Sequence, residues 1–389
     1  MGNGVDGLLD RTRALVPALK EQAEAAEQAR HVLPGTYDAL AEAGVFKMCV
    51  PERFGGYEAD FETQCDVLAT IAVGCPSSSW VATIFSAMAW LAATLPDEAQ
   101  EEILGDGDPR ISGGLSPTGT ATPTSGGVTL NGSWPFNTGN FGAKWTVVNA
   151  LRPLDDGEGV MPTCVLVPCR DLTALDDWHA SGMIATGSCT VVAEDVFVPA
   201  HRSYPLPLMI ESQYPADRQN AANPYFNLPL ASMLIVNAAG TPAGTARGAY
   251  ESFMERLPGR AITYTAYDDK AAAPVTHLQV GEAAMRIHSA DAHMRRAAAL
   301  LDDNLGKPLT LEERVRAQAH VSHSTGEARA AVDLLFFASG ASSIQQHVPI
   351  QRYQRDIQAL ANHALMHPQT AIELYGRVLC GLEPNTPIY

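Results

Sequence analysis

Residues 111–205 differ in character from the chain on either side of them, and this change constrains the fold more than any other feature. Gly, Thr, Ser and Val dominate the segment, and its apolar residues come in short runs. Turn residues such as Gly126-Gly127 separate runs with strand-like composition, at 128–136, 145–150, 164–167 and 190–198. The flanking segments are helical in spacing. The sequence therefore predicts an α+β chain with an inserted β domain.

We divide the chain on this pattern into an N-terminal helical domain (1–110), a central β domain (111–205) and a C-terminal helical bundle with a leading loop (206–389). Residues 206–228 hold three prolines and little periodicity, which predicts a long ordered loop. We expect helices at 62–73, 78–95, 232–256, 275–304, 311–339, 352–363 and 368–380. The long helices of the last part are typical of a four-helix bundle. The stripe Gly240, Ala243, Gly244 and Gly248 predicts close helix packing.

Composition excludes several classes of protein. The 26 basic against 43 acidic residues give a net charge of −17, which argues against nucleic-acid and anionic-membrane partners. The seven cysteines form no CxxC pair, so we expect neither a disulfide framework nor a zinc ribbon, and we assign no metal. Because no run approaches ~20 apolar residues and the N-terminus lacks signal-peptide features, we expect a cytoplasmic protein without a membrane segment.

The segment NGSWPFNTGNFGAKW at residues 131–145 carries the most information. It resembles a strand of the acyl-CoA dehydrogenase superfamily, in which an aromatic residue and a Thr or Ser two positions later lie along a flavin ring. Here these residues are Phe136 and Thr138. Strand residues two apart share one face, so both side chains can line the same ring.

Two further segments resemble the same superfamily. TGSCTVVAEDVFVP at residues 186–199 is similar to its strand that ends in an acidic-Val-x-Val-Pro turn, and residues 352–356 are similar to its Arg-x-x-Arg-Asp helix start. The three segments follow the family's order across the whole chain. The resemblance implies the fold of that family, with an N-terminal helical domain, a central β domain and a C-terminal four-helix bundle.

The sequence departs from the dehydrogenases at their catalytic base. In many of them a glutamate closely follows the Arg-Asp pair, but here no carboxylate occurs between Asp356 and Glu373, and His363 stands nearby. This substitution resembles the group D two-component flavin monooxygenases. The resemblance implies His363 as a catalytic residue that hydrogen-bonds a phenol and accepts its proton. It also implies Thr138 as a catalytic residue near flavin N5.

The same resemblance implies the remaining site residues. Thr186 and Ser188 match the branch's Thr-Gly-Ser turn at the flavin, and Ser116 occupies the place where backbone groups meet the pyrimidine edge. Arg260 resembles an arginine that reaches the flavin of a neighbouring subunit, and Ser342 lies in a glycine-bearing turn near that flavin. A surface arginine and a plain helix break are the alternatives for these two.

The sequence also lacks two histidines of the branch's phenol hydroxylases, at Met88 and Gly142. Trp80, Phe85, Met88 and Trp90 instead form a bulky apolar wall, and we assign Trp80, Phe85 and Met88 to the substrate pocket. Such a wall suits a large flat aromatic substrate, for example a polycyclic polyketide of antibiotic biosynthesis. Helix core is the alternative for these side chains.

The resemblance thus implies an oxygenase component that takes reduced FMN, or reduced FAD, from a separate NAD(P)H:flavin reductase. It would hydroxylate an aromatic substrate with O2 through a flavin C4a-hydroperoxide, as a homotetramer. Three alternatives stay open: an N- or S-oxygenase of the same fold, a flavin dehydrogenase acting on thioesters, and a non-catalytic scaffold. The first does not need His363 as a base, the second would retain oxidised FAD, and the third would not bind flavin.

Overall fold

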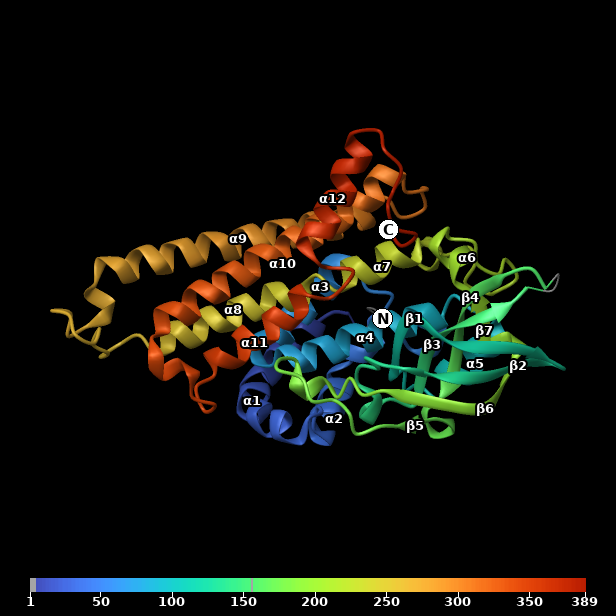
Figure 1. The fold of residues 1–389 in the computed structure, drawn as a ribbon, viewed down its shortest axis with the longest axis horizontal. Coiled ribbons are helices and arrows are strands. Elements are labelled where there is room, and N and C mark those ends of the chain that lie inside the picture. Colours follow the sequence, from blue (N-terminus) through green and yellow to red (C-terminus); the bar gives the residue numbers. More distant parts are fainter. Residues whose placement is uncertain (1–4, 155–156) are drawn as a thin grey trace.

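The computed structural model describes residues 5–154 and 157–389, and it places a twisted sheet beside a bundle of long helices (Figure 1). The helical, β and helical parts follow one another in the predicted order. The N-terminal helices are α1 (Leu8–Ala29), α2 (Pro34–Ala43), α3 (Phe61–Gly74), α4 (Pro76–Ala92) and α5 (Asp97–Leu104). Asp60 caps α3 by accepting a hydrogen bond from the Thr63 amide at 2.7 Å, and Pro76 opens α4.

The central sheet has seven strands in the order β5-β6-β2-β1-β3-β4-β7. The strands are β1 (Ile111–Thr124), β2 (Gly127–Trp134), β3 (Trp145–Pro153), β4 (Val160–Pro168), β5 (Thr173–Ala174), β6 (Val191–Pro199) and β7 (Ser203–Pro205). Only β1 and β3 pair in parallel; the other pairs are antiparallel. Val147 belongs to the core shared with the helices and Val148 to a second core within the β domain, as strand alternation requires.

Sequence reasoning missed β1, the longest strand. Gly113, Gly114, Pro117 and Pro123 lower its strand propensity, because glycine weakens a strand and proline lacks an amide donor. The pairing of β1 with β3 accommodates these residues by shifting register between Gly113 and Pro117 and again between Pro117 and Gly119. A bulged strand of this kind carries no simple alternation in its sequence.

The C-terminal part begins with α6 (Leu206–Ile210) and a short turn at Pro224–Asn227, so the predicted loop 206–228 is interrupted. The predicted helix 232–256 is two helices, α7 (Leu230–Asn237) and α8 (Gly240–Glu255). Pro242 explains the break, because its missing amide is tolerated in the first turn of a new helix and not in the middle of a continuous one. The remaining helices are α9 (Pro274–Asp302), α10 (Leu311–Ser339), α11 (Ile350–Ala361) and α12 (Pro368–Leu379).

The small-residue stripe of α8 lies directly on α3, as predicted. An ideal Cβ at Gly240 would lie 2.3 Å from the Cys65 carbonyl oxygen, and one at Gly244 would lie 2.0 Å from that of Ala69. A side chain at either position would therefore push the two helices apart. This contact joins the N-terminal helices to the C-terminal bundle in one hydrophobic core. In the described residues, no helix is both long and apolar enough to span a bilayer.

Candidate active site

Three hydroxyl groups meet where the turn after β2 faces the turn before β6. Thr138 Oγ1 lies 2.8 Å from Ser188 Oγ, which lies 2.6 Å from Thr186 Oγ1. All three side chains are buried. Backbone hydrogen bonds fix the two turns to each other, since the Gly139 amide donates to the Thr186 carbonyl at 2.9 Å. The structure thus brings together three residues that the sequence assigned to the flavin.

Phe136 does not have the extended strand conformation on which its assignment to the flavin face rested. The predicted strand 128–136 ends at Trp134, and Phe136 has φ +61°, so strand alternation does not relate it to Thr138. A left-handed phenylalanine is uncommon and is found where the surroundings impose it. Its ring is 68% exposed and meets the edge of Trp178, with ring centroids 5.9 Å apart. A large aromatic ring thus lies open beside the buried hydroxyl groups.

Ser116 lies in the irregular part of β1. Residues 114–116 fall between the paired positions Gly113 and Pro117, and Ser116 is exposed. The isolated bridge between Gly113 and Thr138 brings this bulge next to the hydroxyl cluster. A bulge beside a site is a common way to direct backbone groups toward a ligand.

A turn at residues 183–189 carries Thr186 and Ser188, and a hydrogen bond to a side chain of α11 fixes this turn. Met183 has φ +53°, and its amide donates to Asp356 Oδ1 at 2.5 Å. The Met183 carbonyl accepts from Thr186 Oγ1 at 2.8 Å and from Trp178 Nε1 at 3.3 Å. Sequence reasoning used Asp356 only as a family mark and did not single out Trp178.

His363 lies just beyond the end of α11. Its amide donates to the Leu360 carbonyl at 3.0 Å, and its ring meets the edge of Trp80, with centroids 5.1 Å apart. Burial lowers the pKa of His363 to about 4, so the imidazole is neutral at physiological pH and able to accept a proton. The Leu365 amide lies 3.4 Å from Nδ1, a contact too long to fix the tautomer.

The three predicted pocket residues on α4 lie near predicted site residues or near residues that adjoin them. Trp80 contacts His363, and the Met88 sulfur would lie 2.9 Å from a Cβ placed on Gly113. Trp80 and Met88 are eight residues apart, so they share one helix face. Phe85 is fully buried against the rings of Phe46 and Tyr37, and its Cε1 would lie 2.7 Å from a Cβ placed on Gly139, the residue after Thr138. The pocket role of Phe85 stays a prediction.

Tyr37 accounts for the glycine at position 142. An ideal Cβ on Gly142 would lie 2.2 Å from Tyr37 Cζ, so no larger residue fits beside this ring. Burial raises the pKa of the Tyr37 hydroxyl, which has no hydrogen-bond partner within the described residues. A neutral aromatic side chain therefore occupies the space that a side chain at position 142 would need. No sequence signal had marked Tyr37.

Arg260 and Ser342 lie together but apart from the other predicted residues. Arg260 Nη2 donates to Ser342 Oγ at 2.8 Å. Arg260 follows α8, and Ser342 lies between α10 and α11, at the end of the bundle opposite the sheet (Figure 1). The single chain therefore assembles the predicted flavin residues in two separate groups.

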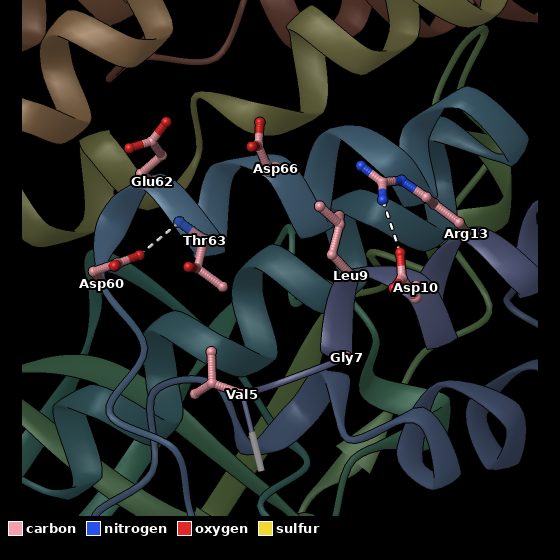
Figure 2. A pocket seen from close by; sticks show the side chains of 9 residues that line it. All are labelled: Val5, Gly7, Leu9, Asp10, Arg13, Asp60, Glu62, Thr63 and Asp66. Carbon is pink, nitrogen blue, oxygen red and sulfur yellow. Dashed lines mark hydrogen bonds and ion pairs between the residues drawn. The ribbon is translucent and has the colours of Figure 1, made fainter. Parts of the chain in front are cut away.

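None of the predicted site residues lines either of two surface hollows in the described part of the chain. Figure 2 shows one of about 380 Å³, between the N-terminal ends of α1 and α3. Its polar lining is mostly acidic, with Asp10, Asp60, Glu62 and Asp66 against Arg13. The other, of about 550 Å³, borders Lys144 and Arg170. Neither lining combines aromatic faces with buried hydroxyl groups.

The residues around Thr138 fit a flavin. A flavin ring is flat and amphipathic, so it needs an exposed aromatic or apolar face together with a few fixed polar groups. Phe136 offers such a face, and the hydroxyl cluster and the bulge of β1 offer the polar groups. Phe141, 53% exposed and in contact with the ring of His31, adds a second aromatic surface next to the turn at Gly187.

Two domains of one protein family match the sequence. Acyl-CoA dehydrogenase, N-terminal domain, matches residues 8–105, and Acyl-CoA dehydrogenase, C-terminal domain, matches residues 237–368. The chain is 33% identical over 380 residues to the oxygenase subunit HsaA of a flavin-dependent monooxygenase from Rhodococcus jostii (strain RHA1), covering 96% of this chain and 98% of the relative. It is 30% identical to the oxygenase component of an FADH2-dependent resorcinol hydroxylase from Rhizobium sp. (strain MTP-10005), covering 97% of this chain and 95% of the relative.

Solved structures agree with these sequence matches. XiaF from Streptomyces sp., in complex with FADH2 and glycerol, superposes with a TM-score of 0.93 at 31% identity, covering 99% of this chain and 98% of the other. The 3-HSA hydroxylase from Rhodococcus sp. RHA1 superposes with a TM-score of 0.91 at 31% identity, covering 98% of each chain. The predicted fold is therefore confirmed over nearly the whole length.

Proposed function

The chain belongs to the family of the oxygenase subunits of two-component flavin-dependent monooxygenases, and from this premise we propose that it hydroxylates a phenolic ring. Reduced flavin, when bound, supplies the reducing equivalents that activate O2 for transfer of one oxygen atom. A separate NAD(P)H-dependent reductase, in the cytoplasm, delivers that flavin. The observation that carries the proposal is a neutral histidine, His363, which contacts Trp80 and stands near the place where the dehydrogenase glutamate follows the Arg-Asp pair.

His363 acts on the substrate in this proposal. A phenol has a pKa near ~10, and its oxygen must lose a proton as the ring is hydroxylated. The neutral imidazole accepts a hydrogen bond from the phenol and takes the proton as the ring is attacked. Accepting the proton at Nε2 requires the tautomer with its proton on Nδ1, in which the long 3.4 Å hydrogen bond from the Leu365 amide to Nδ1 is given up. Trp80 holds the imidazole from the side.

Thr138, Ser188 and Thr186 would hold the flavin ring through their hydroxyl groups, with Phe136 along its face and the backbone near Ser116 at its polar edge. Two relatives at 30% identity or more have FADH2 in their names, which favours reduced FAD over reduced FMN. We therefore expect reduced FAD to bind more tightly than reduced FMN. Anaerobic titration of the protein with each flavin measures this difference directly.

We further propose that the protein works as a homotetramer. Arg260 and Ser342 lie at the far end of the bundle, so they reach a flavin only if that end meets the site of another copy. An exposed apolar stripe on α9, formed by Val275, Leu278 and Met285, lies on the same side of that helix and suits helix-to-helix contact. Light scattering tests this proposal, because Leu278→Asp should dissociate the tetramer and weaken flavin binding. A wild-type monomer with full activity contradicts it.

The apolar wall suggests the class of substrate. Trp80 and Met88 are apolar side chains of α4 that are 7% and 3% exposed, and the Tyr37 ring takes the place of any side chain at position 142. A large flat phenol, such as a polycyclic polyketide of antibiotic biosynthesis, would bury more apolar area there than a small hydroxylated acid. Comparing the specificity constants of monocyclic and polycyclic phenols tests this preference.

The handling of flavin tests the proposal as a whole. We expect protein purified without added flavin to be colourless, to bind oxidised flavin weakly and reduced flavin tightly, and to form a hydroxylated phenol when air is admitted. NADH alone should reduce nothing, since the sequence carries no Rossmann fingerprint. A stoichiometric yellow protein that NADH reduces directly would contradict the two-component arrangement.

A further inference from the structure

We propose that Asp356 is a positioning residue that holds the flavin-facing hydroxyl groups in fixed register with His363. The inference rests on the proposed function for the roles of Thr138 and His363, but its structural part does not. Asp356 belongs to α11, and its carboxylate reaches the turn at residues 183–189. One helix thus connects the group that acts on the substrate with the groups that face the flavin.

The contact between α11 and the turn is close and specific. Asp356 is 1% exposed, and its Oδ1 accepts the Met183 amide at 2.5 Å. Arg355 Nη1 donates to the Ser181 carbonyl at 3.1 Å, and an ideal Cβ on Gly182 would lie 2.1 Å from the Arg355 carbonyl oxygen. No residue larger than glycine therefore fits between the turn and the helix.

Hydrogen bonds continue from this contact to Thr138. The Met183 carbonyl accepts from Thr186 Oγ1 at 2.8 Å, Thr186 Oγ1 lies 2.6 Å from Ser188 Oγ, and Ser188 Oγ lies 2.8 Å from Thr138 Oγ1. Each member is buried, so water does not replace a lost partner. Because Met183 is left-handed, an external hydrogen bond is needed to keep this turn in place.

The other end of the connection is His363. It follows Asp356 by seven residues, two helical turns, and its amide still bonds to the Leu360 carbonyl at 3.0 Å. A shift of α11 along its axis would therefore move His363 and the anchor of the hydroxyl cluster together. The helix fixes the distance between the substrate base and the flavin-facing hydroxyl groups.

The charges around Asp356 show that packing alone does not explain a carboxylate here. Glu27 on α1 forms ion pairs with the two nearby arginines, at 3.3 Å from Arg352 Nε and 2.7 Å from Arg355 Nη2. Asp356 Oδ2 has no hydrogen-bond partner within the described residues. The thiol of Cys75 also lies close to Asp356. A buried carboxylate with one unpaired oxygen destabilises the folded state. We therefore attribute the presence of Asp356 to the hydrogen bond that it accepts from the Met183 amide.

Asp302 offers a matched control. Its carboxylate also accepts backbone amides, of Phe61 at Oδ1 (3.0 Å) and of Glu62 at Oδ2 (3.2 Å), and burial raises its pKa. It binds the first amides of α3, which Asp60 caps, and lies outside the proposed site. A purely structural carboxylate should behave as Asp302 does, whereas a positioning carboxylate should also affect the flavin.

The experiment compares Asp356→Ala with Asp302→Ala by amide hydrogen exchange in flavin-free protein and by anaerobic titration with reduced FAD. We expect Asp356→Ala to speed exchange in residues 181–189 and to weaken reduced-FAD binding by about tenfold, the loss typical of a charge-assisted hydrogen bond. Asp302→Ala should speed exchange near residues 61–64 only. Asp356→Asn, which keeps an acceptor oxygen, should restore most of the binding.

Two results would overturn the inference. One is unchanged exchange in residues 181–189 in Asp356→Ala; the other is an equal loss of flavin affinity in both alanine variants. If Asp356→Ala does not fold, the same two measurements on Asp356→Leu decide, because leucine is close to aspartate in size and has no acceptor oxygen for the Met183 amide. Because the exchange measurement needs neither flavin nor substrate, it stands even if the hydroxylase proposal fails.

Discussion

Replacing His363 with Asn removes the proposed base while keeping a side chain that hydrogen-bonds. The pKa of about 4 at His363 lies roughly six units below that of a phenol near ~10, so full proton transfer before the reaction would cost about 8 kcal/mol. That is about half of the ~16 kcal/mol barrier of an enzyme that turns over at ~10 s⁻¹. We therefore expect transfer during attack on the ring, when the phenol oxygen becomes far more acidic.

The variant should slow hydroxylation by ~10²–10⁴-fold, the usual contribution of a general base. Oxygen activation does not involve His363 in this account, so O2 should still oxidise the reduced flavin and be released as hydrogen peroxide. The assay measures product and peroxide per reduced flavin in single turnovers, with His363→Ala as a second variant. Because the imidazole is already neutral above pH ~4, wild-type hydroxylation should show no loss from this group between pH 6 and 9. A His363→Asn enzyme that hydroxylates at the wild-type rate across this range would refute the reasoning.

Three further predictions concern the surroundings of the site. Thr138→Ala should raise peroxide release even without substrate, because it removes a hydroxyl from the flavin-facing cluster; peroxide release equal to wild type would count against that role. Gly142→Ala should lower the free energy of unfolding by about 1–3 kcal/mol through the clash with the Tyr37 ring, and adding Tyr37→Ala should remove most of this further loss in urea denaturation. Burial raises the pKa of Asp356 to about 7, so the folded state binds its proton more tightly than the unfolded state, and this contribution to stability is lost as pH rises from about 4 to 7. Wild-type stability should therefore fall relative to Asp356→Asn across that window, by at most about 1.4 kcal/mol per pH unit; a parallel pair of curves contradicts the assignment.

The order of the fold followed from residue patterns, because α3, α9 and α10 have sustained helical spacing and clear ends. The helix predicted at 311–339 is observed as α10 with the same bounds, where Thr310 and Glu313 form a capping box. Strand β1 could not be predicted from its residue pattern, because its glycines and prolines belong to a bulge that forms only in pairing with β3. The break between α7 and α8 depended on Pro242, a signal that was present and not used.

The site was predictable to the extent that its residues lie in short segments. Thr138, Thr186 and Ser188 were assigned from local motifs, and the structure brings them within hydrogen-bond distance. The link from Asp356 to Met183 spans 173 residues of sequence, and no local pattern reports such a pairing. The conformation of Phe136 was also hidden, since a positive φ at phenylalanine comes from the tertiary surroundings rather than from its own preference.

The central claim is that this chain transfers one atom of O2 to a phenol by means of reduced flavin that it does not itself produce. The most direct test is a single turnover in which protein loaded anaerobically with chemically reduced FAD meets ¹⁸O2 and a panel of monocyclic and polycyclic phenols, followed by mass spectrometry of the products. The account predicts one ¹⁸O atom in a hydroxylated phenol, with the yield strongly reduced in His363→Asn. Only hydrogen peroxide and unchanged phenols from the wild-type protein, across the panel and with reduced FMN as well, would contradict it.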